Sequence, residues 1–384
     1  MAQRRQMWVR HNQLQPERPL ILVFPEGAWR EILPESSCIC ESQTARAIEW
    51  SLRARTYAHE NIHDDSVVEA SWTVSKVVHN SGWGLEPQHD PSSVVNGAWG
   101  FHPVINQLND LNKLIYPQVT IDAQQTYQNL AQAQDLFGDI LDVKLVGVAH
   151  ISFHLMSLYC QLRGLDQVVW DMYDLPEMLH RAMSILEEGN RQILQQYIDL
   201  DLLSLNNDNT YHSSGGVGYT SELPAEDFQD KVRPCDMWAS AEAQEMAQVS
   251  PAMHAEFILP YEKRLLEPFG LTGYGCCEDL TAKLPDVLTI PHIRRISISP
   301  FADVERCAEQ LERQAIFSWK PHPAYLVGEF DADHIRAYIK RTLDAASAHD
   351  CALEMILKDT HTCESHPERF TLWTDIAQQV VASS

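Results

Sequence analysis

Hydrophobic positions follow two different spacings in the second half of the chain. Residues 176–200 carry apolar side chains at helical spacing, and Pro176 fits the first turn of a helix, where its missing N–H is not needed. Short apolar runs rich in Ile, Val and Leu lie between such segments, as is typical of strands buried on both faces. The pattern predicts strands that alternate with helices from about Gly164 to the C-terminus.

The positions of individual elements follow from where each pattern starts and stops. Ser250 is the expected N-cap of one helix, with Pro251 at its first position, and Pro260 is expected to bend that helix. The predicted strands or short apolar segments are 202–205, 271–277, 296–299, 315–319 and 352–357, and the predicted helices are 176–200, 251–269, 302–314, 333–348 and one near Pro367. Upstream, the pattern predicts a helix at 45–57, a strand at 67–78, and a loop followed by a helix at 97–136.

The repeat of strand, loop and helix is typical of a parallel sheet with helices packed against it. A closed barrel and an open doubly wound sheet both fit this pattern. No G-x-G-x-x-G follows a strand, which weakens the dinucleotide-binding form of the open sheet, and residues 215–218 are predicted to form a flexible loop. The predicted fold class is therefore α/β.

Composition narrows the class of protein. With 384 residues, 45% of them hydrophobic, the chain has enough apolar material for one large α/β domain. There are 29 basic and 53 acidic residues, giving a formal net charge of −24, and such a surface repels nucleic-acid phosphates and anionic lipid headgroups. No apolar run approaches the roughly 18 residues that span a bilayer. We expect a small-molecule substrate, with neither a nucleic-acid nor a membrane partner.

The cysteines indicate the compartment. There are nine, an odd number spread through the chain, which is not the pattern of a secreted disulfide framework. Residues 1–15 are polar and basic without an apolar core, unlike a signal peptide. We expect a cytoplasmic protein with reduced thiols, and a homodimer is a common assembly for such an enzyme.

Polar side chains follow each of the five predicted strands. In parallel α/β proteins, the loops at the carboxyl ends of the strands hold the active site. The five segments are 206–212, 274–279, 300–303, 320–323 and 358–364. We expect their side chains to gather at one edge of the fold.

Cys276, Cys277 and Glu278 form the most specific cluster in these segments. Thiols beside a carboxylate are ligands that zinc accepts, and His361 and Cys363 would complete the site from the last strand end. Adjacent residues of an extended chain point to opposite sides, so one of the two cysteines would normally face the metal. The alternative is that both cysteines are small buried hydrophobic residues.

Four further residues are candidates for substrate binding or proton transfer. Lys320 would bind an anionic group or pair with Asp359. His322, in the same loop, is a candidate ligand or general acid–base. Asp236 would line a pocket or cap the following helix. The alternatives are a surface lysine and a loop histidine without a chemical role.

Residues 250–261, with the sequence S-P-A-M-H-A-E-F-I-L-P-Y, resemble the S-P-x-x-F-x-E-F-x-x-P-Y helix of the uroporphyrinogen decarboxylase superfamily, which includes the cobalamin-dependent methyltransferases. Arg163-Gly164, Asp171 and residues 174–177 resemble a second block of that superfamily, and residues 274–278 fall where its methyltransferases carry a His-x-Cys zinc pair. The resemblance runs from about Gly147 to the C-terminus. It implies a (β/α)₈ TIM-type barrel over residues 61–384, with residues 1–60 as an N-terminal helical extension packed on it.

The chain departs from the superfamily at two places. The Arg-Gln-Ala-Gly-Arg stretch of the decarboxylases is absent, which argues against porphyrinogen decarboxylation, and the histidine of the zinc pair is replaced in Tyr274-Gly275-Cys276. Three functions stay open. The first, which we favour, is a zinc-dependent methyltransferase that moves a methyl group between a small substrate or thiol and a partner corrinoid protein. The second is a metal-independent decarboxylase or lyase for a small carboxylic acid, using Lys320, Asp359 and Asp236. The third is a non-catalytic barrel that binds a corrinoid carrier.

Overall fold

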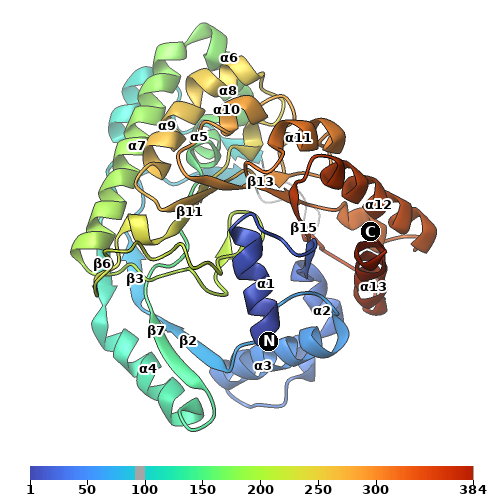
Figure 1. The fold of residues 1–384 in the computed structure, drawn as a ribbon. Helices are drawn as coiled ribbons and strands as arrows, with labels where there is room; N and C mark the ends of the chain where they lie inside the picture. Colours follow the sequence, from blue (N-terminus) through green and yellow to red (C-terminus); the bar gives the residue numbers. More distant parts are fainter. Residues whose placement is uncertain (91–99, 384) are drawn as a thin grey trace. The chain divides into compact units, whose positions relative to one another are not determined.

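The computed structural model describes residues 1–90 and 100–383, and its chain divides into two compact units (Figure 1). Unit 1 consists of Met1–Glu69, Ser214–Thr220 and Arg294–Ser384, and unit 2 of Ala70–Ser213 and Ser221–Ile293. The first boundary between the units falls between Glu69 and Ala70, and the N-terminal segment supplies a strand that pairs inside unit 1. The predicted division into residues 1–60 and 61–384 stays a prediction. Residues 97–99 of the loop predicted at 97–136 lie outside the described residues.

Unit 1 contains four parallel strands in the order β1, β15, β14, β13. Their bounds are β1 Leu20–Val23, β13 Ile293–Ile298, β14 Ile316–Trp319 and β15 Ala352–Leu357, and a short strand, β10, spans Gly216–Val217. Leu22 pairs with Ile356, and Phe317 with Leu353. Every residue of β1, β14 and β15 is buried, as expected for strands covered on both faces. The strands predicted at 315–319 and 352–357 are confirmed.

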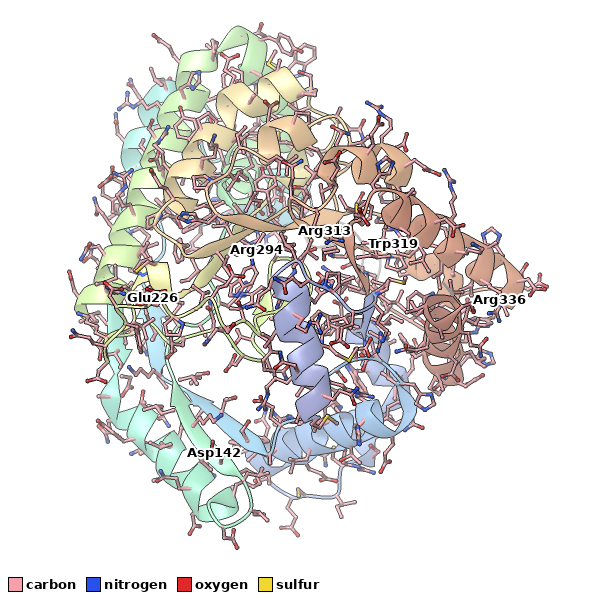
Figure 2. The ribbon with its side chains drawn as sticks, in the orientation of Figure 1. Asp142, Glu226, Arg294, Arg313, Trp319 and Arg336 are labelled. Atoms are coloured by element: carbon pink, nitrogen blue, oxygen red, sulfur yellow. The ribbon has the colours of Figure 1, made fainter. Side chains whose placement is uncertain are left out.

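Helices cover the strands of unit 1. They are α1 Ala2–Asn12, α2 Trp29–Ile32, α3 Gln43–Asn61, α11 Val304–Leu311, α12 Ala332–Ala348 and α13 Glu368–Ala382, with one-turn helices η1 Glu26–Ala28, η2 Glu35–Ser37 and η6 Pro323–Leu326. Asp303 and Asp331 start α11 and α12 by accepting hydrogen bonds from backbone N–H groups of the first turn. The ring of Trp319, on β14, lies 5.0 Å from that of Tyr338 on α12, so this helix packs on the sheet through an aromatic contact. Trp319 is labelled in Figure 2, which draws the ribbon with its side chains.

The first helix contributes directly to the core of unit 1. Trp8 is fully buried and belongs to one hydrophobic cluster with Leu20, Leu22 and Ile356. Burying an indole of this size contributes a few kcal/mol, roughly 1.5–3 for a large apolar side chain. Residues 1–60 therefore supply a strand and core side chains to unit 1 in addition to helices.

Unit 2 also contains a parallel sheet, with strands in the order β8, β11, β12. Their bounds are β8 Ser152–Phe153, β11 Trp238–Ala241 and β12 Leu271–Tyr274. The other strands are β2 Ser71–Ser75, β3 Val77–Asn80, β4 Gln88–Asp90, β5 Gly100–His102, β6 Val119–Asp122, β7 Asp142–Val146 and β9 Tyr211–His212. β2 pairs with β7 in parallel, whereas β3–β6 and β4–β5 are antiparallel pairs.

Two helices of unit 2 start where the sequence predicts, at Pro176 and Pro251. They are α4 Ala123–Phe137, α5 Leu155–Arg163, α6 Leu165–Asp174, α7 Pro176–Asp199, α8 Pro251–Phe257, α9 Leu259–Leu266 and α10 Leu284–Val287, with one-turn or short helices η3 Leu108–Lys113, η4 Pro234–Asp236 and η5 Gln244–Met246. The Ser250 hydroxyl accepts from the N–H of Met253, which confirms the predicted cap. The helix predicted at 251–269 is interrupted at Ile258, because Pro260 lies in the first turn of a second helix.

The α/β class is confirmed, with parallel strands in both units, and closure into an eight-stranded barrel stays a prediction. The strand predicted at 202–205 is reduced to a single bridge between Leu203 and Val148. Within the described residues, none of the helices combines the length and the hydropathy that a membrane crossing requires.

Candidate functional site

Ionisable side chains gather where the three parallel strands of unit 2 end. His154 follows β8, Glu242 follows β11, and Cys276, Cys277 and Glu278 follow β12. The three strands are neighbours in one sheet, and the carboxyl ends of parallel strands share an edge. We refer to these five residues as the strand-end cluster.

His154 and Glu242 form the first pair of this cluster. His154 Nδ1 lies 2.9 Å from Glu242 Oε1, and the side chains are 43% and 12% exposed. The hydrogen bond from Glu242 is the main cause that raises the pKa of His154, and the charges of Glu245 and Glu278 add to it. The carboxylate fixes the orientation of the ring, so the pair suits proton transfer near neutral pH.

Glu278 joins the loops that follow β11 and β12. Its carboxylate accepts hydrogen bonds from Cys276 N at 2.8 Å and from Ala243 N at 3.3 Å, and the residue is 2% exposed. Burial is the main effect and raises the pKa of this carboxyl. The hydrogen bonds that the carboxylate accepts partly offset this increase. Glu278 therefore holds the thiol-bearing loop in place through contacts to its backbone.

The two thiols lie on the same side of their loop. Cys276 Sγ and Cys277 Sγ are 3.5 Å apart, with Cys276 half-buried and Cys277 exposed. The expectation that adjacent cysteines point apart applies to extended chain, whereas here the chain bends directly after Gly275, whose φ is 89°. Both sulfurs are therefore available to the same ligand.

Zinc chemistry fits part of the predicted ligand set. Two thiolates at this spacing suit a soft divalent ion. Glu278, however, uses both oxygens on backbone N–H groups of unit 2. Across residues 1–90 and 100–383, no group of three or more His, Cys, Asp and Glu side chains is arranged around a point that suits a metal ion. The thiol pair is the part of the set whose geometry supports zinc.

The other two predicted ligands, His361 and Cys363, lie in unit 1. His361 is exposed, and Cys363 is fully buried. The Cys363 thiol donates to Glu31 Oε2 at 3.2 Å, and burial together with the Glu31 charge raises the pKa of the thiol to about 11. A thiol held in the protonated form by a carboxylate does not fit the role of a metal thiolate.

Lys320 belongs to a buried charged network rather than to an open loop. Its Nζ donates to Ser318 O at 2.9 Å and to Ser318 Oγ at 2.7 Å, and Lys320 is 4% exposed. The Ser318 hydroxyl donates to Glu354, which also receives Arg295 Nε at 2.9 Å. Burial opposes ionisation of Glu354, but Arg295, His11 and Lys320 hold its pKa well below the usual range.

The remaining candidates have mainly local partners. Asp359 is half-exposed with φ 59°, its N–H donates to Glu26 Oε2 at 2.7 Å, and its carboxylate lies 3.5 Å from Lys358 Nζ. His322 Nδ1 accepts from Ala324 N at 3.2 Å and caps η6. The substrate-binding and proton-transfer roles of Asp359 and His322 stay predictions.

Asp236 lies at the wrong end of its strand for a strand-end site. It precedes β11, whereas Glu242 follows it. The buried carboxylate accepts from Arg233 Nε at 3.0 Å and from the N–H groups of Arg233 and Ala225. These contacts show that the side chain organises the turn before β11, and the substrate-binding role predicted for Asp236 stays a prediction.

Tyr274 occupies the position of the expected zinc histidine and is fully buried. Its hydroxyl donates to Glu262 Oε2 at 2.7 Å and lies 2.8 Å from His254 Nε2. Burial raises the pKa of Glu262 well above its usual range and lowers that of His254 to about 3. Tyr274 thus ties the end of β12 to α8 and α9.

The sequence interpretation did not single out His154, and it considered Glu242 only as a residue that would line a pocket or cap the following helix. The strand before His154 has only two residues, too few for a recognisable apolar run. The strand before Glu242, Trp-Ala-Ser-Ala, is rich in small residues. The available signal was the position of each polar residue directly after a short apolar stretch.

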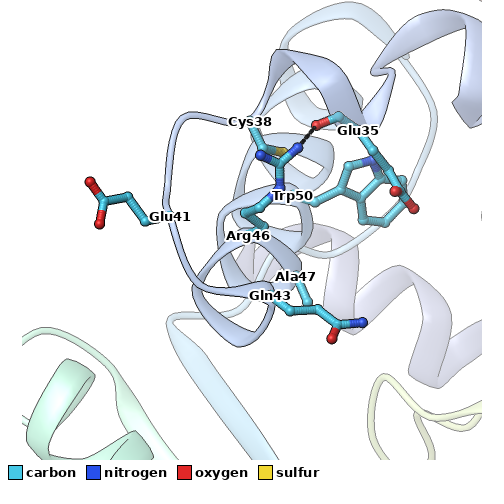
Figure 3. A pocket seen from close by; sticks show the side chains of 7 residues that line it. All are labelled: Glu35, Cys38, Glu41, Gln43, Arg46, Ala47 and Trp50. Carbon is cyan, nitrogen blue, oxygen red and sulfur yellow. Dashed lines mark hydrogen bonds between the residues drawn. The ribbon is translucent and has the colours of Figure 1, made fainter.

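A separate cavity of about 470 Å³ lies in unit 1 between η2 and α3 (Figure 3). Its lining residues are Glu35, Cys38, Glu41, Gln43, Arg46, Ala47 and Trp50. The guanidinium of Arg46 donates to the carbonyl oxygen of Glu35 at 2.6 Å, and the Glu41 side chain points away from the others in Figure 3. No residue of the strand-end cluster contributes to this lining, so we do not assign it to the reaction.

No protein-family model matches the chain, and no curated protein matches it in sequence. Among solved structures, the chain is similar to a methyltransferase from Methanosarcina mazei, with a TM-score of 0.54 over 98% of both chains and 9% sequence identity. At this identity the similarity establishes a shared fold, and function has to be argued from the site.

Proposed function

We propose that the chain is a methyltransferase whose reaction takes place at the strand-end cluster of unit 2. The observation that carries the proposal is the thiol pair of Cys276 and Cys277, with sulfurs 3.5 Å apart, at the end of a strand whose sheet also presents His154 and Glu242. The fold similarity to a methyltransferase supports the same reaction class. The proposed acceptor is a small thiol, and the proposed donor is a corrinoid protein.

Zinc is part of this proposal. Cys276 and Cys277 would hold the ion, and bound zinc would supply Lewis acidity that favours the thiolate form of an acceptor thiol. A cytoplasmic location and reduced thiols suit this chemistry.

The protein's own residues handle the proton and the position of the thiols. His154, oriented by Glu242, accepts the proton of the acceptor thiol. The thiolate sulfur then attacks the methyl carbon, and the cobalt–carbon bond breaks with its electron pair staying on the corrinoid. Glu278 keeps the loop of Cys276 and Cys277 against the end of β11 throughout.

The direct test uses methylcobalamin as donor and 2-mercaptoethanol as acceptor, with loss of the methylcobalamin absorbance as the readout. We expect Cys276→Ser and Cys277→Ser to reduce turnover roughly 100-fold, a barrier increase of about 2.7 kcal/mol, and to lose bound zinc in elemental analysis. Cys235→Ser is the matched control, because this half-buried thiol lies before β11 at the opposite end of the same sheet.

Two outcomes contradict the proposal separately. Turnover that both serine variants retain would remove the thiol pair from the reaction. Full activity of a wild-type protein that carries no zinc would remove the metal but leave methyl transfer. The lyase alternative has less support, because Asp236 organises a turn at the opposite end of β11 and Lys320 is buried in a network with Ser318.

A further inference from the structure

Unit 2 contains a cavity with the size and lining of a small-molecule site. It has a volume of about 750 Å³ and lies among β5, α5, α6 and η5. Pockets that bind small molecules typically measure roughly 300–1,000 Å³ and combine apolar walls with a few polar groups. Phe101, Pro103, Leu165 and Trp170 supply apolar and aromatic walls here.

The charges that face this cavity are predominantly negative. Asp166 and Glu245 line it, and neither carboxylate has a hydrogen bond or ion pair with another side chain or backbone group in the described part of the chain. Unpaired carboxylates beside aromatic rings attract a cation, because the ring face is also electronegative.

Among the lining residues that the structure describes, Arg163 is the one cation, and its charge is already paired. Its guanidinium donates to both oxygens of Asp171 at 2.8 Å, and Nη1 donates to the carbonyl oxygens of Ile105 and Asn106 at 3.1 and 2.8 Å. Arg163 is 4% exposed. Four of its five N–H groups are therefore used inside the protein, and it has little capacity left for an anionic ligand.

We propose that this cavity binds a quaternary ammonium compound, with the methylated nitrogen against Trp170 and Phe101 and its charge balanced by Asp166 and Glu245. The apolar walls suit the methyl groups, and the ring faces and carboxylates suit a cation that cannot donate a hydrogen bond. This inference goes beyond the proposed function, whose acceptor is a small thiol and whose donor is a corrinoid protein, and assigns the cavity a ligand class of its own.

The position of Glu245 connects this cavity to the strand-end cluster. Glu245 lies in η5, three residues after Glu242, and the charge of Glu245 acts on His154. Electrostatic coupling of this kind requires short separation inside a protein. A ligand in the cavity is therefore near the side chains proposed to act in methyl transfer.

The test is calorimetric binding of choline to the full chain, compared with 3,3-dimethylbutan-1-ol, its uncharged carbon isostere. We expect saturable choline binding and binding of the isostere that is about tenfold weaker or less. Trp170→Ala should weaken choline binding about tenfold, and Glu245→Gln about fivefold at low salt. Tyr173→Ala is the matched control, since Tyr173 is a similarly exposed aromatic on the same helix, 69% against 63% for Trp170, and does not line the cavity.

Three results would each overturn the inference: no saturable choline binding, equal affinity for the isostere, or unchanged affinity in a Trp170→Ala variant that melts at the wild-type temperature. The experiment contains no methylcobalamin, so its result is separate from the transfer assay. Active methyl transfer without choline binding would support the proposed function and contradict the proposed ligand of the cavity. Choline binding without methyl transfer would support the proposed ligand and contradict the proposed function.

Discussion

The parallel strands of unit 1 and the strand ends of unit 2 differ in how their charged residues are placed. In unit 1, Lys320, Arg295 and Glu354 are at most 4% exposed and hydrogen-bonded within one network. In unit 2, His154 is 43% exposed and Cys277 is exposed. Charges that are desolvated and fully paired chiefly support the fold, whereas partly solvated groups with one fixed partner are free to react. The difference supports a structural role for the first set and the proposed chemical role for the second.

The largest expected effect comes from breaking the network of unit 1. Glu354→Gln should lower the free energy of unfolding by about 3–5 kcal/mol, because it leaves Arg295 buried beside an uncharged amide. Glu354 has a lowered pKa in the folded protein, so its contribution is present above the unfolded pKa and lost as the pH falls below it. Urea unfolding measures the change.

Glu305→Gln is the control for that measurement. Glu305 pairs with Arg341 on the surface, where the two side chains are 49% and 69% exposed, and the loss should be about 0.5 kcal/mol or less. Equal losses in the two variants would contradict the assignment of a structural role to the buried network.

A smaller effect is expected at the second carboxylate of unit 1. Burial opposes ionisation of Glu31, but hydrogen bonds from Thr362, Ser365 and Cys363 lower its pKa to about 2. The stability that these bonds add is present above the unfolded pKa of about 4.3 and is lost as the pH falls toward 2. Wild type and Glu31→Gln should therefore differ in unfolding free energy at pH 6 and converge near pH 2. A difference independent of pH would show that charge is not its source.

The smallest effect on stability, and a clear effect on chemistry, is expected in unit 2. Glu242→Gln removes the main cause that raises the pKa of His154, so that pKa should fall, and the pH dependence of turnover should move to lower pH with it. The pair stabilises the folded protein below the unfolded His pKa, and that contribution is lost as the pH rises through the folded pKa. NMR titration of the His154 ring gives the shift directly. If the pKa of His154 does not change in the Glu242→Gln variant, His154 has a structural role like that of the buried charged residues of unit 1.

The sequence predicted helices and buried strands correctly where the hydrophobic pattern was long or where a particular residue type marked the end of the element. α7 begins at Pro176 and β15 spans the predicted residues 352–357, because a helix start and a buried apolar run are local properties. The sequence did not predict β8, because two residues are too few to show a hydrophobic period. Its pairing with β11 also depends on residues far along the chain.

The candidate site was predictable in part for the same reason. Cys276, Cys277 and Glu278 lie directly after a strand, and their position follows from parallel topology. Sequence spacing does not reveal tertiary partners. These partners determine the burial of Lys320, the hydrogen bond from the Cys363 thiol to Glu31 and the location of Asp236 before β11. The residue types identified the candidates, and their hydrogen-bond partners in the folded protein were needed to interpret them.

The pairing of β1 with β15 has a consequence for how the protein is made. Leu22 leaves the ribosome before its partner Ile356, which lies 356 − 22 = 334 residues further along the chain. An apolar strand without its partner is prone to aggregation during that interval. Nascent chains stalled before residue 352 should thus depend on chaperones, and the emergence of residues 352–357 should allow the strands of unit 1 to pair.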